Sequence, residues 1–161
     1  MSSPSKTPKR KNPYWVALRL LSFRQRSERE LFERLKKKKF PEKKIRRLIK
    51  DLKEKKFLDD KKFARDFVLY RIETHPEGKT LLKKRLFQKK VPGEIIDKTL
   101  EKLLKKEKEL ELALIAAKKK RNLLRTKDLT PKELRFKISF FLSSRGFSRD
   151  VIKETLLKIK I

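Results

Sequence analysis

The sequence predicts an all-α protein built from three tandem three-helix repeats that form an elongated, curved array. One stretch of the chain occurs three times, at residues 35–52, 86–103 and 142–159. In each copy, apolar residues recur four apart before a turn and then four and three apart after it. That is the spacing of one face on each of two helices joined by a tight turn. Charged residues make up 44% of the chain and there are three glycines, a composition that favours helices over sheets.

The three copies align on one apolar residue at the turn. This residue is Phe40, Val91 or Phe147, so the period is 51 and then 56 residues. The next residue is Pro41, Pro92 or Ser148. Proline is favoured at the first position of a helix and serine at its N-cap, so the second helix of each copy should begin at the same place. A unit of about 50 residues has a marginal core by itself, so packing against a neighbouring repeat should stabilise it.

We expect four segments along the chain: a disordered basic N-terminal arm at residues 1–13 and three-helix repeats at 14–58, 59–105 and 106–161. Prolines interrupt the arm and nothing apolar gives it a core. Its Lys9-Arg10-Lys11 run is compatible with a nuclear signal or a phosphate-binding arm, but a solvated tail is the preferred interpretation.

The first repeat should contain helices at about 14–23, 28–38 and 41–56. The first of these is apolar nearly all round, which predicts a buried helix. Ser27 and Glu30 match a capping box before the second helix. In that motif the serine oxygen accepts from the amide of the glutamate, and the carboxylate reaches back to the serine amide.

The second repeat should contain helices at about 61–73, 79–89 and 92–105. Asp59 and Asp60 precede the first of them, where carboxylates satisfy the free amides of a helix N-terminus. The loop between the first two helices contains His75-Pro76-Glu77-Gly78, which breaks the helical pattern.

The third repeat should contain a long helix at about 106–124, a second helix from Pro131 to about Ser144, and a last helix that reaches the C-terminus. Thr130 and Glu133 form a second predicted capping box. Gly146 lies where a helix commonly ends in a left-handed residue.

Composition narrows the functional class. The net charge is +29, which attracts polyanions: nucleic acid, an acidic protein face or an anionic membrane. There are no cysteines, which excludes disulfides and fits a reducing compartment, so we expect a cytoplasmic protein. The N-terminal residues lack the apolar segment of a secretory signal. The longest wholly apolar run, Leu112–Ala117, is far shorter than the roughly 18 residues of a spanning helix, which predicts solubility.

No residue pattern indicates catalysis, a metal or a cofactor. His75 stands alone in a loop, without the partners of a metal site or an activated nucleophile. Asp59 and Asp60 are better explained as helix caps than as a catalytic or metal-binding pair. Three glycines are too few for a Gly-rich phosphate loop. We therefore expect a protein that is not an enzyme.

The most informative feature is a basic surface in the first repeat. Residues 36–56 contain twelve Lys or Arg and three acids, a local net charge of +9. At 100° per residue, Lys43, Arg47 and Lys50 form a row opposite the apolar stripe, with Arg46 beside it. A solvated lysine-rich face is the alternative, but acids would normally be interspersed on such a face, so a polyanion contact is preferred.

Two more basic clusters are predicted in the third repeat. One contains Lys118, Lys119, Lys120, Arg121, Arg125 and Lys127, and the other contains Arg135, Arg145, Arg149 and Lys153. The middle copy carries acids at the corresponding outward positions, so binding charge is expected on the outer repeats. Most phenylalanines, and also Tyr14, Trp15 and Tyr70, are expected in the core or at turns, which disfavours base stacking. Membrane-surface binding is disfavoured because the apolar stripes are needed for helix packing.

Several blocks of this sequence resemble the RecX family of recombinase regulators. The first block comprises Ala17, Leu18, Leu21, Ser22, Arg24, Ser27, Glu30, Leu31 and Leu35. The second comprises Phe57-Leu58-Asp59-Asp60, Phe63-Ala64, Phe67-Val68 and Arg71. Gly78 with Leu82 and Leu86, and Leu142 with Arg145-Gly146-Phe147, complete the resemblance. The order and spacing of these blocks carry it, over nearly the whole chain. Lys39-Phe40 and Lys90-Val91 depart from the Lys-Gly common at these turns in the family.

The resemblance implies a regulator of the RecA recombinase. Family members are three tandem three-helix repeats that lie in the groove of the RecA filament on DNA, inhibit its ATPase and strand exchange, and bind DNA weakly without sequence preference. We expect a monomer that needs no cofactor, with the candidate contact residues in the basic clusters above. Two alternatives stay open: a general DNA- or RNA-binding protein without a recombinase partner, and a helical scaffold for acidic proteins.

Overall fold

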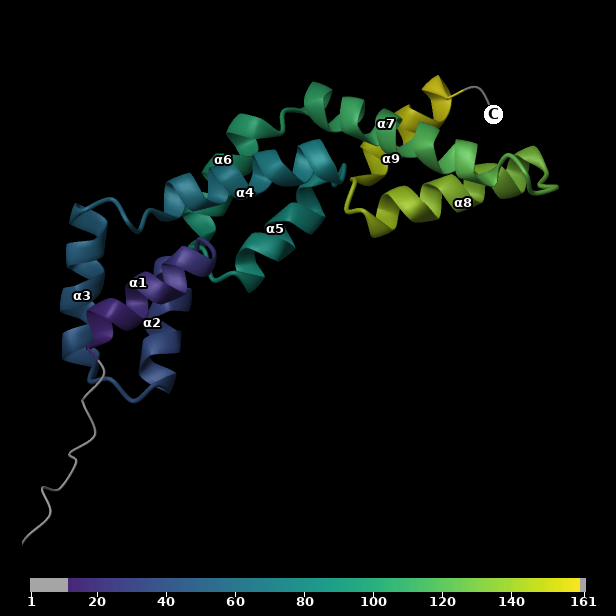
Figure 1. Ribbon diagram of the computed structural model, residues 1–161. Helices are drawn as coiled ribbons and strands as arrows, with labels where there is room; N and C mark the ends of the chain where they lie inside the picture. The colour runs from purple at the N-terminus through teal and green to yellow at the C-terminus, as the bar shows by residue number, and fades with distance from the viewer. Residues whose placement is uncertain (1–11, 160–161) are drawn as a thin grey trace, which may run out of the picture. The chain divides into compact units, whose positions relative to one another are not determined.

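A computed structural model describes residues 12–159, in which every regular element is an α-helix and there is no strand (Figure 1). The helices are α1 (Pro13–Phe23), α2 (Glu28–Lys37), α3 (Glu42–Glu54), α4 (Asp60–Thr74), α5 (Lys79–Gln88), α6 (Gly93–Leu103), α7 (Lys106–Leu124), α8 (Pro131–Ser144) and α9 (Arg149–Lys158). This order confirms the predicted all-α class and the three successive groups of three helices. The predicted disordered arm lies outside the described residues except for Asn12, the N-cap of α1, and Pro13, its first residue.

The chain divides into two compact units, residues 1–59 and 60–161. In the first unit, α1, α2 and α3 surround a core of eight buried residues: Ala17, Leu31, Leu35, Ile45, Leu48, Ile49, Leu52 and Leu58. In the second unit, α4–α9 share one continuous core, which includes Val68, Leu86, Leu100, Ala117 and Ile138. The helices that the sequence assigns to the second and third repeats therefore bury their apolar faces in a common interior.

Helix α1 differs from its prediction as a helix buried on all sides. Only Ala17 is buried, whereas Trp15 is 67% exposed and Phe23 is 73% exposed. The reason is the small size of the unit, because α2 and α3 can cover only one side of α1. An apolar sequence was thus a poor guide to burial at this position.

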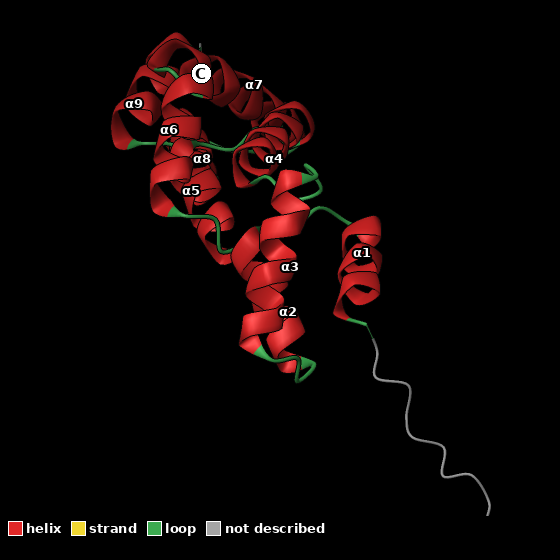
Figure 2. Cartoon of the chain, turned by 90° about the vertical axis from the view of Figure 1, so that its left-hand side faces the viewer, coloured by secondary structure: helices red, strands yellow, loops and turns green. Residues whose placement is uncertain are grey.

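The three turns that align in sequence share one backbone geometry. The residue before the apolar turn residue has a positive φ in each: 63° at Lys39, 62° at Lys90 and 80° at Gly146. The amide of the next residue donates to the carbonyl five residues back, with N–O distances of 3.3 Å for Phe40–Leu35, 3.2 Å for Val91–Leu86 and 3.2 Å for Phe147–Leu142. These bonds identify Schellman motifs at the ends of α2, α5 and α8. Short loops then lead into α3, α6 and α9 (Figure 2).

The helix starts agree with the sequence to within a residue. Pro41, Pro92 and Ser148 are all N-cap residues, so α3 and α6 begin one position later than predicted. The capping box of Thr130 and Glu133 is confirmed in both directions. At Ser27 the serine half is confirmed, because its Oγ accepts from the amide of Glu30 at 3.2 Å. Capping by Asp59 and Asp60 stays a prediction, although Asp60 lies in the first turn of α4.

Backbone contacts between the start of α5 and the turn after α8 hold the second unit together. The Gly78 amide donates to the Arg145 carbonyl at 2.9 Å, and the Thr80 amide donates to the Gly146 carbonyl at 3.2 Å. From α7, the buried carboxylate of Glu109 accepts from the Lys79 amide at 2.9 Å, which caps α5 with a side chain from another helix. These bonds fix the position of the α8–α9 turn, and with it the backbone of Arg145.

Candidate binding surfaces

The basic row predicted on α3 lies on an exposed face of that helix. Lys43, Arg47 and Lys50 are exposed, whereas Ile45, Leu48, Ile49 and Leu52 on the opposite side are buried. Among the described residues, none of these three cations forms an ion pair. The fourth, Arg46, lies 3.8 Å from a carboxylate oxygen of Glu42, and its guanidinium stacks 5.2 Å from the Phe32 ring centroid.

Three acids on or beside α3 pair with cations outside the row of Lys43, Arg47 and Lys50. Glu42 accepts from Lys36, with a nitrogen–oxygen distance of 2.6 Å, and this hydrogen bond and the lysine charge hold the pKa of Glu42 below its ordinary value. Asp51 pairs with Lys55 at 3.1 Å, and Glu28 pairs with Lys53 at 2.7 Å. None of these three acids pairs with Lys43, Arg47 or Lys50, so the α3 row can attract an anionic partner.

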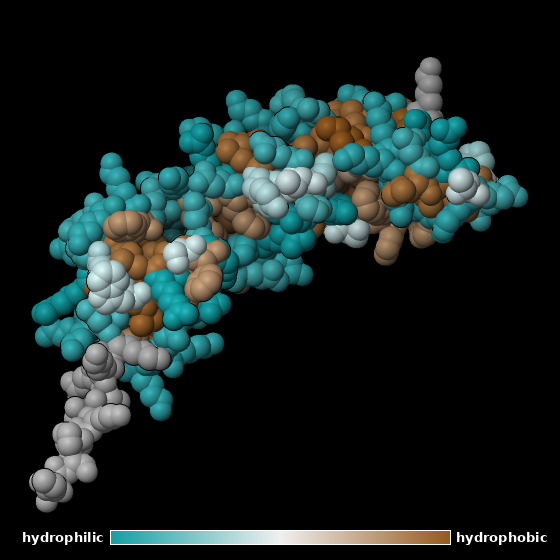
Figure 3. All heavy atoms as spheres, viewed as in Figure 1, coloured by the Kyte–Doolittle hydropathy of each residue, from teal (hydrophilic) through white to brown (hydrophobic). Residues whose placement is uncertain are grey.

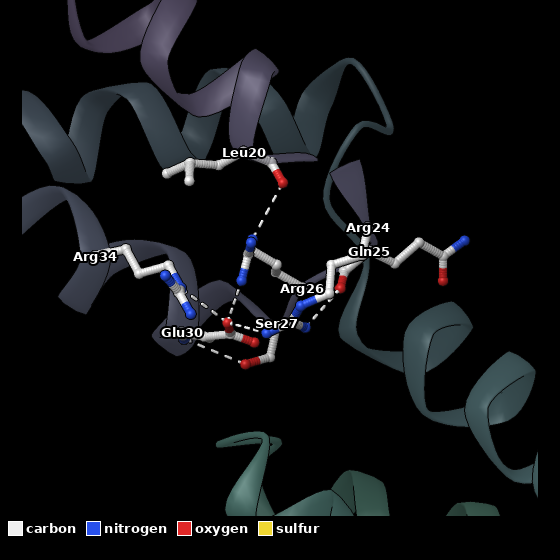
Figure 4. Close-up of polar contacts among 7 residues, drawn as sticks. All are labelled: Leu20, Arg24, Gln25, Arg26, Ser27, Glu30 and Arg34. Carbon is white, nitrogen blue, oxygen red and sulfur yellow. Dashed lines mark hydrogen bonds and ion pairs between the residues drawn. The ribbon is translucent and has the colours of Figure 1, made fainter. Parts of the chain in front are cut away.

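A buried carboxylate, Glu30, forms ion pairs with three arginines in the first unit (Figure 4). Its Oε1 accepts from Arg26, from Arg24 Nη2 at 2.5 Å and from Arg34 Nε at 3.0 Å. Burial raises the pKa of Glu30, but the hydrogen bonds and charges of the arginines outweigh it, so the pKa lies below the ordinary value. Arg26 also donates to the Leu20 carbonyl at 3.1 Å, which ties the C-terminal turn of α1 to α2.

A second buried carboxylate, Glu77, has the same role in the second unit. Its side chain is fully buried and accepts from Arg71, and from Arg85 Nε and Nη2 at 2.9 Å each. Burial raises the pKa of Glu77, and the two guanidinium groups more than offset this, so its pKa is lowered. Several arginines thus form ion pairs with buried carboxylates. The sequence analysis did not predict these ion pairs. The four-residue spacing of Arg26, Glu30 and Arg34 could have indicated the first cluster, but no helical spacing relates Glu77 to its partners.

The four consecutive cations of α7 do not form one surface. At 100° per residue, Lys118, Lys119, Lys120 and Arg121 point around most of the helix. Lys118 and Lys119 are exposed, whereas Lys120 and Arg121 are half-buried. Arg125 and Lys127 are exposed after the end of α7.

The structure nevertheless joins the two predicted basic clusters of the third repeat. The Lys120 Nζ lies 5.3 Å from the ring centroid of Phe141, and the Arg145 guanidinium lies 5.2 Å from the same centroid. The face of an aromatic ring attracts a cation without neutralising its charge, so the Phe141 ring brings these two cations together. The other members of the last cluster are exposed: Arg135, Arg149 and Lys153.

Exposed aromatic side chains are the main departure from the sequence analysis. Six of the eleven phenylalanines are buried or half-buried and Phe57 lies in a turn, so the expectation for most phenylalanines holds, but Phe23, Phe87, Phe136 and Phe140 are exposed. The core packing expected of Trp15 and Tyr70 is wrong, because both are exposed, and Tyr14 is half-buried. On α8, Phe136 and Phe140 are 71% and 68% exposed and lie four residues apart, hence on one face. Apolar patches accordingly interrupt the polar surface (Figure 3).

Other kinds of site receive no support within residues 12–159. No group of three or more acidic or histidine side chains in this range could hold a metal ion. His75 is exposed, and its Nδ1 lies 2.9 Å from Thr74 Oγ1. No helix in the same range is long and apolar enough to cross a membrane.

Comparisons with known proteins agree on one family. Three domain models match in succession: the first three-helix domain of RecX at residues 14–52, the second at 59–100 and the third at 107–156. A regulatory protein RecX of Chlorobium phaeobacteroides is 34% identical over 92% of this chain and 94% of its own length. One of Chlorobaculum tepidum is 36% identical over 87% and 83%. The crystal structure of RecX from Lactobacillus salivarius is 25% identical, with a TM-score of 0.81 over 91% of this chain and 93% of that one.

Proposed function

Because the chain belongs to the RecX family, we propose that it binds the RecA recombinase filament on DNA and inhibits its ATPase and strand exchange during recombination and repair. The observation that carries the proposal is the match of all three RecX domains, in order, over most of the chain. The RecX relatives are named regulatory proteins, and we propose that this chain likewise acts without catalysis, as a cytoplasmic monomer.

The proposed mechanism is steric and electrostatic. The α3 row of Lys43, Arg47 and Lys50, with Arg46 beside it, contacts DNA phosphates or an acidic recombinase surface. A second contact is centred on Lys120 of α7 and Arg145 after α8, which share the Phe141 ring. The other candidates are Lys118, Lys119, Arg121 and Arg149, of which those on the same side as Lys120 contribute. Occupation of the filament groove hinders extension or closure of the filament. The α3 row supports this assignment, because Lys43, Arg47 and Lys50 form no ion pair within residues 12–159. The arginines that pair with Glu30 and Glu77 are partly neutralised, so they attract an anionic partner less strongly.

The test is RecA ATPase on single-stranded DNA with this protein titrated in. Replacing Lys43, Arg47 and Lys50 together by Glu should abolish most of the inhibition. The matched control carries Lys84→Glu, Lys105→Glu and Lys132→Glu, which change the net charge equally at exposed positions outside the candidate clusters. The control should inhibit like the wild type. Full inhibition by a folded α3 variant would contradict the site, and absence of inhibition by the wild type would contradict the function.

A general binder of single-stranded DNA or RNA is the second candidate function. Phe136 and Phe140 support it, because exposed rings offer platforms for base stacking and Arg135 and Lys137 beside them can contact phosphates. This function predicts that nucleic-acid affinity falls as the salt concentration rises. The logarithm of the affinity should fall by about 0.7 per tenfold rise in salt for each phosphate neutralised. It also predicts no effect on recombinase ATPase at matched occupancy of the DNA.

A further inference from the structure

A groove in the second unit runs between α4 and α6, with a volume of about 670 Å³. Two rows of cations border it, each with a spacing of four residues that places both members on one helix face. These are Lys61 and Arg65 on α4, and Lys98 and Lys102 on α6. The floor is formed by Ile95, Thr99 and Leu103, which are half-buried and follow one another at the same spacing along α6.

The groove has a strong positive balance. Glu94 is the one acid among its lining residues, against four cations, which leaves a net of three positive charges. The Lys98 Nζ lies 2.6 Å from Glu94 Oε1. This hydrogen bond and charge, with a weaker effect from Lys61, hold the pKa of Glu94 below its ordinary value, so the carboxylate is ionised at neutral pH. An anionic occupant therefore meets an attractive field from both sides.

The floor of the groove separates two kinds of anionic occupant. Ile95 and Leu103 are aliphatic, and no aromatic ring lines the groove on which a nucleic-acid base could stack. An aliphatic floor between two charged rows instead matches an amphipathic helix whose apolar face lies in the groove. Carboxylates spaced four apart on the flanks of such a helix would face the cation rows.

We propose that the α4–α6 groove binds an acidic amphipathic helix of a partner protein. The sequence favours binding charge on the outer repeats, because the middle copy carries Glu94, Asp97 and Glu101 on its second helix. Two of these acids do not line the groove: Asp97 pairs with Lys83 of α5 at 2.6 Å, and Glu101 lies outside the lining. Glu94 lines the groove but pairs with Lys98. The proposal does not rest on recombinase binding.

The test is fluorescence anisotropy of the full chain with a labelled amphipathic peptide that carries leucines on one face and glutamates on both flanks. Arg65→Glu combined with Lys102→Glu should weaken binding at least about tenfold, because attraction becomes repulsion at both rims. The control, Lys84→Glu with Lys105→Glu, makes the same charge change outside the groove and should bind like the wild type. A second peptide, with serine in place of leucine, keeps its charge and should bind weakly.

Three results would overturn the proposal. The first is equal affinity of the groove variant and the wild type for the leucine peptide. The second is equal affinity of the serine and leucine peptides, which would leave only a nonspecific charge effect. The third is binding of a single-stranded oligonucleotide with the same dependence on Arg65 and Lys102, which would make the groove a nucleic-acid site. The assay contains no recombinase, so its outcome is separate from that of the ATPase test.

Discussion

Gly78 and Gly146 touch through their backbones, although 68 positions separate them in sequence. A Cβ atom on Gly78 would lie 2.3 Å from the Gly146 carbonyl oxygen, and one on Gly146 would lie 2.3 Å from the Leu81 amide nitrogen. Both distances are far inside van der Waals contact with main-chain atoms, which cannot swing away as a side chain can. Glycine at these two positions is therefore what allows the start of α5 to dock on the turn after α8.

Replacing Gly78 by Ala should destabilise the second unit by about 2 kcal/mol, because overpacking forces the two backbone segments apart. Chemical denaturation of the full chain measures this effect. Gly93→Ala is the matched control, since a Cβ there meets no atom within 4 Å, and it should be neutral or stabilising by about 0.5 kcal/mol. Equal behaviour of the two variants would show that the glycine contact contributes nothing.

Replacing Lys39 or Lys90 by Gly should stabilise the chain by about 0.5–1 kcal/mol. Both lysines have φ values near those of left-handed residues, 63° and 62°, where a Cβ is strained and glycine is not. Lys84→Gly, in the interior of α5, should instead destabilise by about 1 kcal/mol. Thermal unfolding monitored by circular dichroism compares the three, and a loss of stability in Lys39→Gly and Lys90→Gly would contradict the strain argument.

Stability should depend on pH through Glu77. Its pKa is lower in the folded chain than the ordinary 4.5, so the folded state favours the ionised form. The resulting stabilisation is complete above pH 4.5 and is lost as the pH falls through the folded pKa. Glu77→Gln should cost about 3 kcal/mol at pH 7, because it leaves Arg71 and Arg85 facing a neutral group, and the difference from wild type should shrink in acid.

Glu101→Gln provides the comparison for Glu77, since Glu101 is exposed, and its unfolding curve should follow the wild type at every pH. Denaturant titrations between neutral and acidic pH would measure the free energy of unfolding of the wild type and both variants. A Glu77→Gln difference that stays constant with pH would mean that the substitution acts through packing rather than through charge.

The second candidate function predicts a specific role for Phe136 and Phe140. Replacing both by Ala should lower the affinity for single-stranded DNA about tenfold, since stacking contributes roughly 1–3 kcal/mol per base, and it should leave duplex affinity unchanged. Stability should also be unaffected, because both rings are exposed. Leu157→Ala, another exposed apolar position, serves as the control. Unchanged single-strand affinity in the double variant would argue against base stacking at α8.

The helical repeat could be predicted because its signal is periodic. The spacing of the apolar residues along each helix predicts which of them are buried, as it does for Ile45 and Ile96. Trp15 and Phe140 could not be placed this way, because apolar character alone does not reveal whether a neighbouring helix covers the residue. The Glu77 cluster and the α4–α6 groove could not be predicted either, because both depend on residues that the fold brings together from different segments of the chain. The α3 row was placed correctly on an exposed face, but its partner remains a prediction.

The boundary between copies in the sequence is not the boundary between cores. Residues 59–105 and 106–161 have the sequence pattern of two copies, yet Val68 and Ile138 belong to the same interior. The six helices should therefore unfold together. A chain cut near residue 105 would expose apolar surface on both fragments. A cut between residues 59 and 60 passes between the two compact units instead, so a fragment beginning at Asp60 is the smallest piece in which the α4–α6 groove keeps its complete support.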